Sequence, residues 1–372
     1  MRGPARPVAA SRPRTASIAR VDRWVGRAGV TTAVAVLLAA CSSAASSTGG
    51  ETVTVPSTAP ATTTTSTTTA AATTTAAPAR ATTVEDLLHL GRPIVLAHTG
   101  GEDQFPASTM FAFGESMQAG VDMLDLNVQL SHDGVLVVHH DDSVDGATNG
   151  TGKVADLDYA AIRALDDAYW FTADCVCKDR PAADYLYRGI RTGDRPPPAG
   201  YTSDDFVVPT LRQLIARYPD VPLNIEVKGT GEPAIAAARE LISELTELGR
   251  LDATVISSFD DQVVDAVRAM APSVEISPGL GAASGWVLSG TPLPAGERIL
   301  QLPPRYEGVE VLTPDVIARS HAAGYVIWVW PDDRSLESAS GYAGLLAEGM
   351  DGLNINFPAT GVQAVQQLVA SR

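Results

Sequence analysis

Chemically useful side chains gather in the stretch Met123–Val144, which reads MLDLNVQLSHDGVLVVHHDDSV. An acid and an amide, Asp125 and Asn127, lie two residues apart and therefore on the same face of a predicted strand. After a tight turn the chain reaches His140 and Asp141. Carboxylate and amide oxygens bind hard cations, and histidine is the commonest proton-transfer group in catalysis. The stretch therefore offers side chains suited to metal binding and to acid–base chemistry.

Such side chains need a scaffold, and apolar strand-like runs alternate with helical patterns over residues 84–372. This alternation predicts a parallel sheet, and about eight units predict an α/β fold, a (β/α)8 TIM barrel. A further apolar run, residues 298–303, is interpreted as lying outside the barrel. The polar stretch of about 143–208 predicts a small inserted lid or subdomain. Strands are predicted at residues 93–98, 123–130, 135–141, 223–229, 253–259, 274–277, 325–330 and 352–355.

In a barrel of this type the site lies at the carboxyl ends of the strands. The side chains that fall there suit metal binding and acid–base chemistry. Trp328 and Trp330 share one face of a strand, and Trp328 is a candidate for lining the substrate pocket, with core packing as the alternative. The residues at these strand ends are His98, Asp125, Asn127, His140, Asp141, Glu226, Lys228, Phe259, Trp328 and Trp330.

The first 41 residues are predicted to be a lipoprotein signal peptide and no part of the fold. Residues 1–29 hold seven Arg and one Asp, and residues 30–40 form an apolar run that is too short for a permanent membrane helix. The run ends in LLAAC, which is typical of a bacterial lipobox. We therefore expect an exported protein, held on the extracytoplasmic face of the cell membrane through lipidated Cys41. An ordinary export signal, in which Cys41 is incidental, is the alternative.

A linker and a strong acidic charge follow the signal. Residues 42–83 are rich in Ser, Thr and Ala and are predicted to be a disordered tether. The whole chain carries a net charge of −16, and the signal contributes +6, which leaves −22 for the rest. This charge argues against nucleic acid as a partner, because binding phosphates needs a basic surface. It argues equally against electrostatic binding to anionic lipid, so the membrane contact would come from the lipid on Cys41.

Two further cysteines, Cys175 and Cys177, lie one residue apart in the predicted insertion. An exported protein meets an oxidising environment, in which a local disulfide is possible. The closed ring would be very small, and the pair offers too few ligands for a metal. We favour a staple within the loop over a redox function.

A series of short motifs runs along residues 90–358. They are HTG at 98–100, PAST at 106–109, Asp125-Leu126-Asn127, the segment 133–141, NGTGKVADL at 149–157, VPTLRQLI at 208–215, Glu226-Val227-Lys228 and Ser258-Phe259. In order and spacing they resemble the motifs of the glycerophosphodiester phosphodiesterase family, which has H-R-G for HTG, P-E-N-T for PAST, E-x-D for 125–127, a D-G to H-D segment for 133–141, E-x-K for 226–228 and S-F for 258–259. The order and spacing hold along the whole domain, which makes the resemblance specific.

The resemblance implies hydrolysis of glycerophosphodiesters to glycerol phosphate and an alcohol. It implies one divalent cation, Ca²⁺ or Mg²⁺, that neutralises non-bridging oxygens. It also implies that the neighbouring glycerol hydroxyl attacks first and that water then opens a cyclic phosphate. The residues it assigns are His98 and His140 as general acid and base, Asp125, Asn127 and Glu226 as cation ligands, and Lys228 and Thr99 as substrate contacts.

Several family positions are substituted in this chain. Asp125 and Asn127 replace Glu and Asp, which lowers the ligand charge from three to two and should weaken cation binding. Thr99 replaces an Arg that would bind phosphate through two hydrogen bonds. Ile355 and Asn356 stand where the family has T-D. Two functions therefore stay open: a metal-dependent phosphodiester hydrolase, favoured by the histidine pair, and a catalytically degenerate relative that binds a polyol phosphate or envelope ligand without turnover.

Overall fold

The computed structural model of the chain describes residues 80–173 and 177–372. The predicted signal peptide, the linker before residue 80 and Cys175 lie outside these residues. Cys177 is disulfide-bonded.

The folded part begins a few residues before the expected boundary at residue 84. Helix α1 (Val84–Leu88) is capped by Thr83, whose hydroxyl accepts a hydrogen bond from the Asp86 amide. Ala81 is buried against Val84 and the first barrel strand. The last residues of the predicted linker therefore belong to the folded domain.

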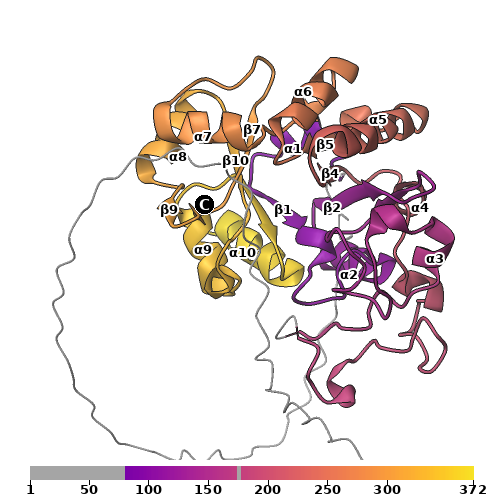
Figure 1. Cartoon of the computed structure of the whole chain (residues 1–372). Helices are drawn as coiled ribbons and strands as arrows, with labels where there is room; N and C mark the ends of the chain where they lie inside the picture. The colour runs from indigo at the N-terminus through magenta and orange to yellow at the C-terminus, as the bar shows by residue number, and fades with distance from the viewer. Residues whose placement is uncertain (1–79, 174–176) are drawn as a thin grey trace, which may run out of the picture. The chain divides into compact units, whose positions relative to one another are not determined.

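Eight parallel strands form a nearly closed barrel, seen in Figure 1 at the centre of the described chain. The strand order runs β6–β5–β4–β2–β1–β11–β10–β7. The (β/α)8 TIM barrel expected from the sequence is thus confirmed. The strands are β1 (Ile94–Ala97), β2 (Met123–Leu130), β4 (Leu223–Val227), β5 (Thr254–Ser257), β6 (Glu275–Ile276), β7 (Ile299–Leu302), β10 (Val326–Val329) and β11 (Gly352–Ile355).

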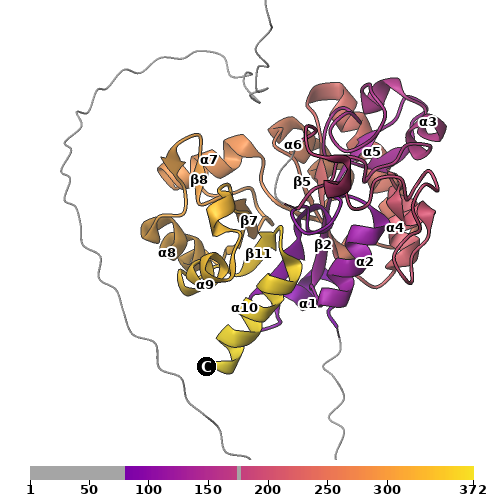
Figure 2. The same cartoon turned by 90° about the horizontal axis from the view of Figure 1, so that it is seen from below.

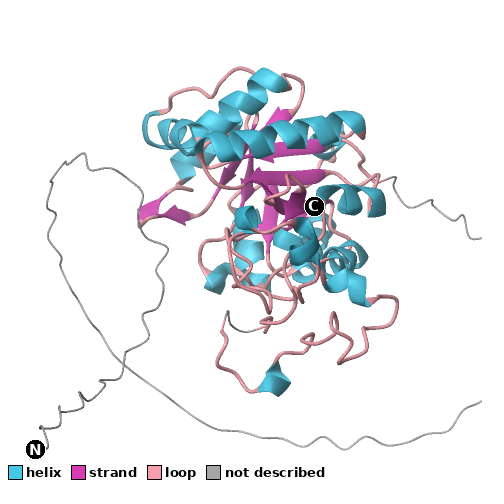
Figure 3. Cartoon of the chain, turned by 45° about the vertical axis from the view of Figure 1, so that its right-hand side comes forward, coloured by secondary structure: helices cyan, strands magenta, loops and turns pink. Residues whose placement is uncertain are grey.

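Helices surround these strands, as Figure 3 shows in cyan around magenta, and Figure 2 shows α10 beside α2. Their starts follow familiar capping rules: Thr109 caps α2, and α10 begins at a proline. No helix of the described residues combines the length and apolar character needed to cross a membrane. The helices are α2 (Met110–Ala119), α3 (Tyr159–Arg163), α4 (Leu211–Arg217), α5 (Gly231–Glu247), α6 (Asp261–Met270), α7 (Leu280–Ser289), α8 (Pro314–Ala322), α9 (Ala339–Ala347) and α10 (Pro358–Ala370).

Burial of apolar side chains on both faces of the strands explains the barrel. All four residues of β1 are buried, as expected for a parallel strand covered on both sides. The outward-facing side chains of the strands pack against the helices and form the main core cluster with them. Helix α6, for example, contributes Val263, Val264 and Val267 to this cluster. Inside the barrel, Leu96, Met123 and Trp328 belong to a second cluster. These two packed layers hold the strand ends in place.

Two strand assignments from the sequence were wrong. The run at 298–303, expected outside the barrel, forms β7 and pairs in parallel with β10. The run at 135–141 instead gives β3 (Leu136–Val138), which pairs antiparallel with β2 and lies off the barrel path. The physical reason is the connection: a tight turn produces only an antiparallel pair, whereas a parallel neighbour needs a long crossover.

The insertion at about 143–208 forms a subdomain with few regular elements, which Figure 3 shows mostly as pink loop. One small apolar cluster joins it to β3 through Val137, Val154 and Ile162, and a second joins Phe206 to Phe111 of α2. None of the described residues of this segment lines the cavity presented below. Of the two interpretations, lid or subdomain, the structure supports the subdomain.

Candidate functional site

A cavity of about 710 Å³ opens at the carboxyl ends of the barrel strands. It collects residues that are far apart in the sequence, because all parallel strands of a barrel end on the same face. Thr99 and Trp328 were also predicted for the site, but they do not line this cavity. The predicted residues that do line it are His98, Asp125, Asn127, His140, Glu226, Lys228, Phe259 and Trp330.

The register between β2 and β4 places the predicted cation ligands side by side. Asn127 lies opposite Glu226, and Asp125 lies opposite Asn224. Side-chain hydrogen bonds follow this register: Asn127 Nδ2 donates to Glu226 Oε2 at 3.0 Å, and Asn224 Nδ2 donates to Asp125 Oδ1 at 2.5 Å. The two-residue spacing seen in the sequence therefore directs both side chains of β2 into the cavity.

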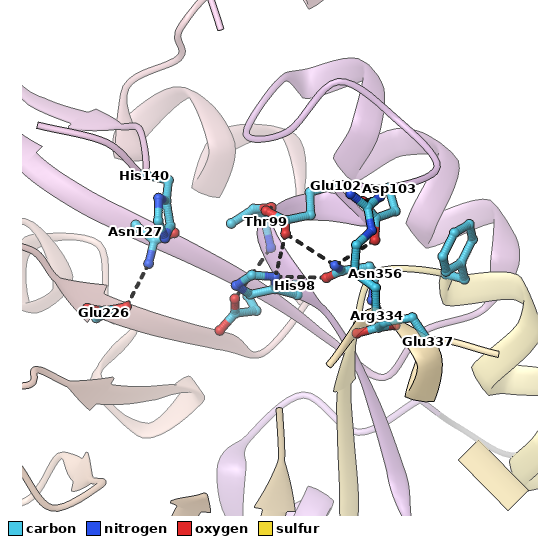
Figure 4. A network of polar contacts seen from close by, with 12 residues as sticks. His98, Thr99, Glu102, Asp103, Asn127, His140, Glu226, Arg334, Glu337 and Asn356 are labelled. Carbon is cyan, nitrogen blue, oxygen red and sulfur yellow. Dashed lines mark hydrogen bonds and ion pairs between the residues drawn. The ribbon is translucent and has the colours of Figure 1, made fainter. Parts of the chain in front are cut away.

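His98 follows β1 and is held by a polar network that joins the segment after β1 to the segments after β10 and β11 (Figure 4). Its Nδ1 lies 2.9 Å from Asn356 Oδ1 and 3.6 Å from Glu102 Oε1. The Asn356 amide nitrogen donates to Glu102 and to Asp103, so its oxygen must face the histidine. Asp103 in turn is paired with Arg334. His98 therefore donates from Nδ1 and presents Nε2 for chemistry.

Burial works against protonation of His98, but its neighbours reverse that effect. The carboxylates of Glu102 and Asp125 and the hydrogen bond to Asn356 together raise the pKa of His98 above its usual value. Burial also raises the pKa of the Asp125 carboxyl, which the opposing charge of His98 and the Asn224 hydrogen bond only partly counter. His98 is thus favoured in its protonated, proton-donating form.

His140 reaches the cavity from the hairpin that follows β3. Its Nδ1 lies 2.8 Å from Asp141 Oδ1, and this bond lowers the pKa of the Asp141 carboxyl, so the ionised acid accepts the Nδ1 proton. Its Nε2 lies 3.4 Å from Lys228 Nζ, which has only hydrogens to donate. His140 Nε2 therefore carries a lone pair. The preceding His139 points away, is buried and bonds to the Ser143 carbonyl.

The two histidine rings have centroids 6.4 Å apart and an edge-to-face arrangement, with their planes inclined by 82°. Figure 4 shows His140 beside Asn127 and Glu226, and His98 beside the Asn356 network. The separation leaves room for a small group that each imidazole could reach. One ring is arranged to give a proton and the other to accept one.

Charge in the cavity is strongly one-sided. Lys228 is the only Lys or Arg among the described lining residues, and it also pairs with Glu226 at 3.2 Å. Five acids line the same cavity: Glu102, Asp125, Glu226, Glu307 and Glu337. An anionic ligand would be repelled by this surplus unless a cation accompanied it.

The cavity lining offers oxygen donors of the type that bind a hard cation. Asn127 is only 2% exposed, and its Oδ1 has no hydrogen-bond partner, so a buried oxygen acceptor is available. Two carboxylates, Asp125 and Glu226, flank it through the β2–β4 register. No three His, Cys, Asp or Glu side chains form a metal-binding group within the described ranges. The residues present therefore suit a low-charge oxygen site for Ca²⁺ or Mg²⁺.

Two predicted substrate contacts lie elsewhere. Trp328 is 1% exposed within the barrel core, whereas Trp330, two residues further along the same face, lines the cavity. The two tryptophans differ in their depth in the barrel: Trp328 lies within it and Trp330 at its carboxyl end. The alternation pattern in the sequence does not show where the barrel core ends. The Thr99 side chain is fully buried and bonds to Glu102, while its amide donates to Asp125 at 3.4 Å. Thr99 thus does not take over the phosphate contact of the family Arg.

Both Thr99 and Ser108 adopt left-handed backbone conformations, with φ of 47° and 61°. Such values are unfavourable, especially for a β-branched residue, and tend to occur at functional sites. The Ser108 amide donates to the Thr99 carbonyl at 2.7 Å, which ties the two loops together. Both residues stand at positions where this chain departs from the family motifs.

Several site residues were missed from the sequence. Asn356 was noted only as a substitution, yet it positions His98. Glu102 follows the HTG motif by two residues, and Asn224 precedes Glu226 by two, so strand alternation alone could have indicated Asn224. Glu337 lines the cavity from the segment before α9, and its carboxylate accepts a hydrogen bond from the backbone N–H of Asn356. No local signal identifies Glu337.

A parallel barrel with two opposed histidines, a lysine and a carboxylate edge at its carboxyl face is the arrangement of a phosphodiester-cleaving enzyme. Comparison with known proteins makes the class definite: the glycerophosphoryl diester phosphodiesterase family model matches residues 98–360. The chain belongs to that family. The expected enzyme class, a phosphoric diester hydrolase, is confirmed at this level.

Individual relatives agree. A glycerophosphodiester phosphodiesterase of Caldanaerobacter subterraneus subsp. tengcongensis is 27% identical over 282 residues, which cover 74% of this chain and 99% of the relative. Among solved structures, a glycerophosphodiester phosphodiesterase from Agrobacterium tumefaciens has a TM-score of 0.53 at 23% identity, covering 73% of this chain and 99% of its own. An Oleispira antarctica phosphodiesterase, solved with the product sn-glycerol-3-phosphate, has a TM-score of 0.55 at 19% identity, covering 74% and 97%. These structures share the fold.

Proposed function

We propose that the protein hydrolyses glycerophosphodiesters to glycerol phosphate and an alcohol, with His98 as general acid and His140 as general base. The observation that carries this proposal is the opposed pair of imidazoles, 6.4 Å apart in the cavity of a family barrel. Their hydrogen bonds distinguish them: Asn356 leaves His98 Nε2 free, and Asp141 holds the proton of a neutral His140 on Nδ1, which leaves Nε2 as the atom that can accept a proton. Proton transfer at positioned histidines typically contributes about 10²–10⁴-fold to a rate.

The proton path follows from these assignments. His140 Nε2 removes the proton from the attacking hydroxyl, which is the glycerol hydroxyl next to the phosphate or a water. The protonated His98 gives its Nε2 proton to the oxygen of the leaving alcohol as the phosphorus–oxygen bond breaks. The raised pKa of His98 favours the form that carries this proton.

Asp125, Asn127 and Glu226 are the residues that would hold a divalent cation. When bound, Ca²⁺ or Mg²⁺ supplies positive charge to the non-bridging phosphate oxygens. The unpartnered Asn127 oxygen and the acid surplus of the cavity support this role. With only two charged ligands, and with Lys228 already paired to Glu226, we expect the affinity for the cation to be weak.

Lys228 is positioned to contact the phosphate. Its ammonium bridges Glu226 at 3.2 Å and His140 at 3.4 Å, so it lies between the cation edge and the base. Since Thr99 does not reach the cavity, Lys228 carries the phosphate recognition that the family divides between Lys and Arg. Trp330 takes the place of Trp328 as the tryptophan available for substrate contact.

The deciding experiment measures hydrolysis of glycerophosphocholine by the full chain with Ca²⁺, with Mg²⁺ and with a chelator. We expect turnover that rises with cation concentration and disappears with the chelator. Lys228→Ala should raise KM, and Lys153→Ala, an exposed lysine outside the cavity, serves as its matched control. Turnover that is unchanged by chelation would contradict the cation assignment.

A second candidate is a family member that binds a polyol phosphate or envelope ligand without turnover. The specific observation that favours it is the uncharged Asn127 at a ligand position, together with the buried Thr99 in place of Arg. Binding of glycerol phosphate without hydrolysis of any glycerophosphodiester, at every cation concentration, would establish this alternative.

We further propose that the protein is exported and anchored to the membrane through lipidated Cys41, with residues 42–79 as the tether. Support comes from the LLAAC sequence after a short apolar run. The disulfide at Cys177 accords with an oxidising compartment.

A further inference from the structure

Part of the cavity lining is apolar and is not used by the chemistry above. Helix α7 contributes Leu280, Ala283, Val287 and Leu288, which follow helical spacing and share one face. Of the α7 residues only Trp286 is buried, where its indole donates to Ser320 at 2.9 Å. The helix therefore anchors to the protein through Trp286 and turns its apolar face towards the cavity.

Exposed apolar side chains concentrate around this opening. The described chain has seven large hydrophobic residues that are exposed, and four of them line the cavity. These four are Phe259, Leu280, Leu288 and Val309, with exposures of 48%, 37%, 73% and 50%. Exposed apolar residues that are grouped, as opposed to scattered, mark binding surfaces.

The cavity is therefore two-sided in chemistry. One set of lining residues holds the ionic and hydrogen-bonding groups around His98 and Lys228, and the other set consists of α7, Val309 and the ring pair Phe259–Trp330. A small polar diester would occupy the first set and leave the second in contact with water. A volume of about 710 Å³ accommodates a larger ligand with both polar and apolar parts.

We propose that the preferred substrate is a glycerophosphodiester that carries one long apolar chain on its glycerol, the chemistry of a lysophospholipid. The chain would lie along Leu280, Val287 and Leu288 and against Val309, while the phosphate lies between the histidines. This inference rests on the proposed function and specifies its substrate class. The glycerol hydroxyl next to the phosphate, one of the two nucleophiles named above, is free in a lipid whose single chain is on the far glycerol oxygen and is absent from a double-chain lipid.

The reaction balances in two steps. The glycerol hydroxyl oxygen forms a bond to phosphorus while the bond from phosphorus to the head-group oxygen breaks; His140 takes the hydroxyl proton and His98 protonates the leaving alcohol. Water then attacks the cyclic phosphate, giving one proton to His98, and His140 returns its proton to the glycerol oxygen. The products are the free alcohol and a chain-bearing glycerol phosphate, and both histidines regain their starting states.

The first test compares glycerophosphocholine with 1-acyl-glycerophosphocholines whose chains have about six to ten carbons, kept below micelle-forming concentrations, using the full chain. Burying one methylene contributes up to about fourfold in binding, so kcat/KM should rise by about tenfold or more along the series. Equal kcat/KM for all chain lengths, with glycerophosphocholine hydrolysed, would overturn the chain site and leave the proposed function intact.

Leu288→Asp and Val309→Asp test the wall itself. Both positions are exposed, so the fold should tolerate the charge, and the preference for the chain-bearing substrate should fall at least fivefold. Leu186→Asp is the matched control, since Leu186 is 58% exposed and outside the cavity. An unchanged preference in both rim variants, or an equal loss in the control, would contradict the proposal.

A binding measurement without turnover tests the chain site separately from the proposed hydrolysis. Dodecylphosphocholine lacks the glycerol hydroxyl, so calorimetry below its micelle-forming concentration reports on chain binding alone. Saturable binding that Leu288→Asp weakens would support the chain site even if no substrate is hydrolysed, and the proposed function would then be the part that fails. Absence of such binding would refute the inference. Binding to phosphatidylcholine vesicles alone would also refute it and identify the rim as a membrane-docking face.

Discussion

Replacing Asn127 by Asp tests the cation edge most directly. In the protein, Asn127 Nδ2 donates to Glu226 Oε2 at 3.0 Å, and the asparagine is almost fully buried. Asn127→Asp removes this donor and places a second carboxylate against Glu226. Without a cation the variant should be less stable, and with a cation it should recover, because the same pair becomes a stronger ligand set.

The magnitude follows from the lost contact. A hydrogen bond to a charged group contributes about 1.5–3 kcal/mol, and the like-charge contact adds to its loss, so the free energy of unfolding should fall by about 2–4 kcal/mol. For a domain of this size each kcal/mol corresponds to about 2 °C, so Tm should fall by about 4–8 °C. A cation at about 100 times its Kd restores about 2.7 kcal/mol.

The assay is thermal unfolding of both proteins in chelator and in increasing Ca²⁺ or Mg²⁺. Asn354→Asp is the matched control: Asn354 is a buried asparagine of β11 that lines the cavity away from β4, so its variant should lose stability without a comparable cation response. An identical cation-induced rise in Tm for all three proteins would refute the assignment of Asn127. So would an Asn127→Asp variant that is as stable as the wild type in chelator.

Other outcomes follow from the same site. His98→Ala and His140→Ala should each lower kcat/KM by about 10²-fold or more, with the circular dichroism spectrum unchanged. His89→Ala is the control, because His89 is exposed and outside the cavity. Near-normal turnover in both site variants would exclude the mechanism. Because His98 acts as an acid whose pKa is raised by Glu102, kcat/KM should fall as pH rises through that pKa. Glu102→Gln should move this fall to lower pH, and a shift to higher pH would contradict the reasoning. Cys41→Ser should release the protein from the membrane fraction, and unchanged fractionation would argue against the lipid anchor.

The sequence by itself was enough to predict the barrel and most of the site. Alternation of strands and helices implies a parallel barrel, and in a parallel barrel every strand ends on one face. Polar residues at strand ends, such as His98, Asn127 and Glu226, are then brought together whatever the details of packing. This is why a local pattern was sufficient for residues separated by more than a hundred positions.

Tertiary structure alone decided which runs entered the barrel and which side chains completed the site. β3 and β7 are both short apolar runs, and only the length of the preceding connection separates a hairpin strand from a barrel strand. Closing the barrel brings β11 beside β1, which places Asn356 on His98 across 258 positions in the sequence. The direction of α7 depends on where Trp286 is buried. Contacts of this kind arise from register and closure, which hydrophobic periodicity does not encode.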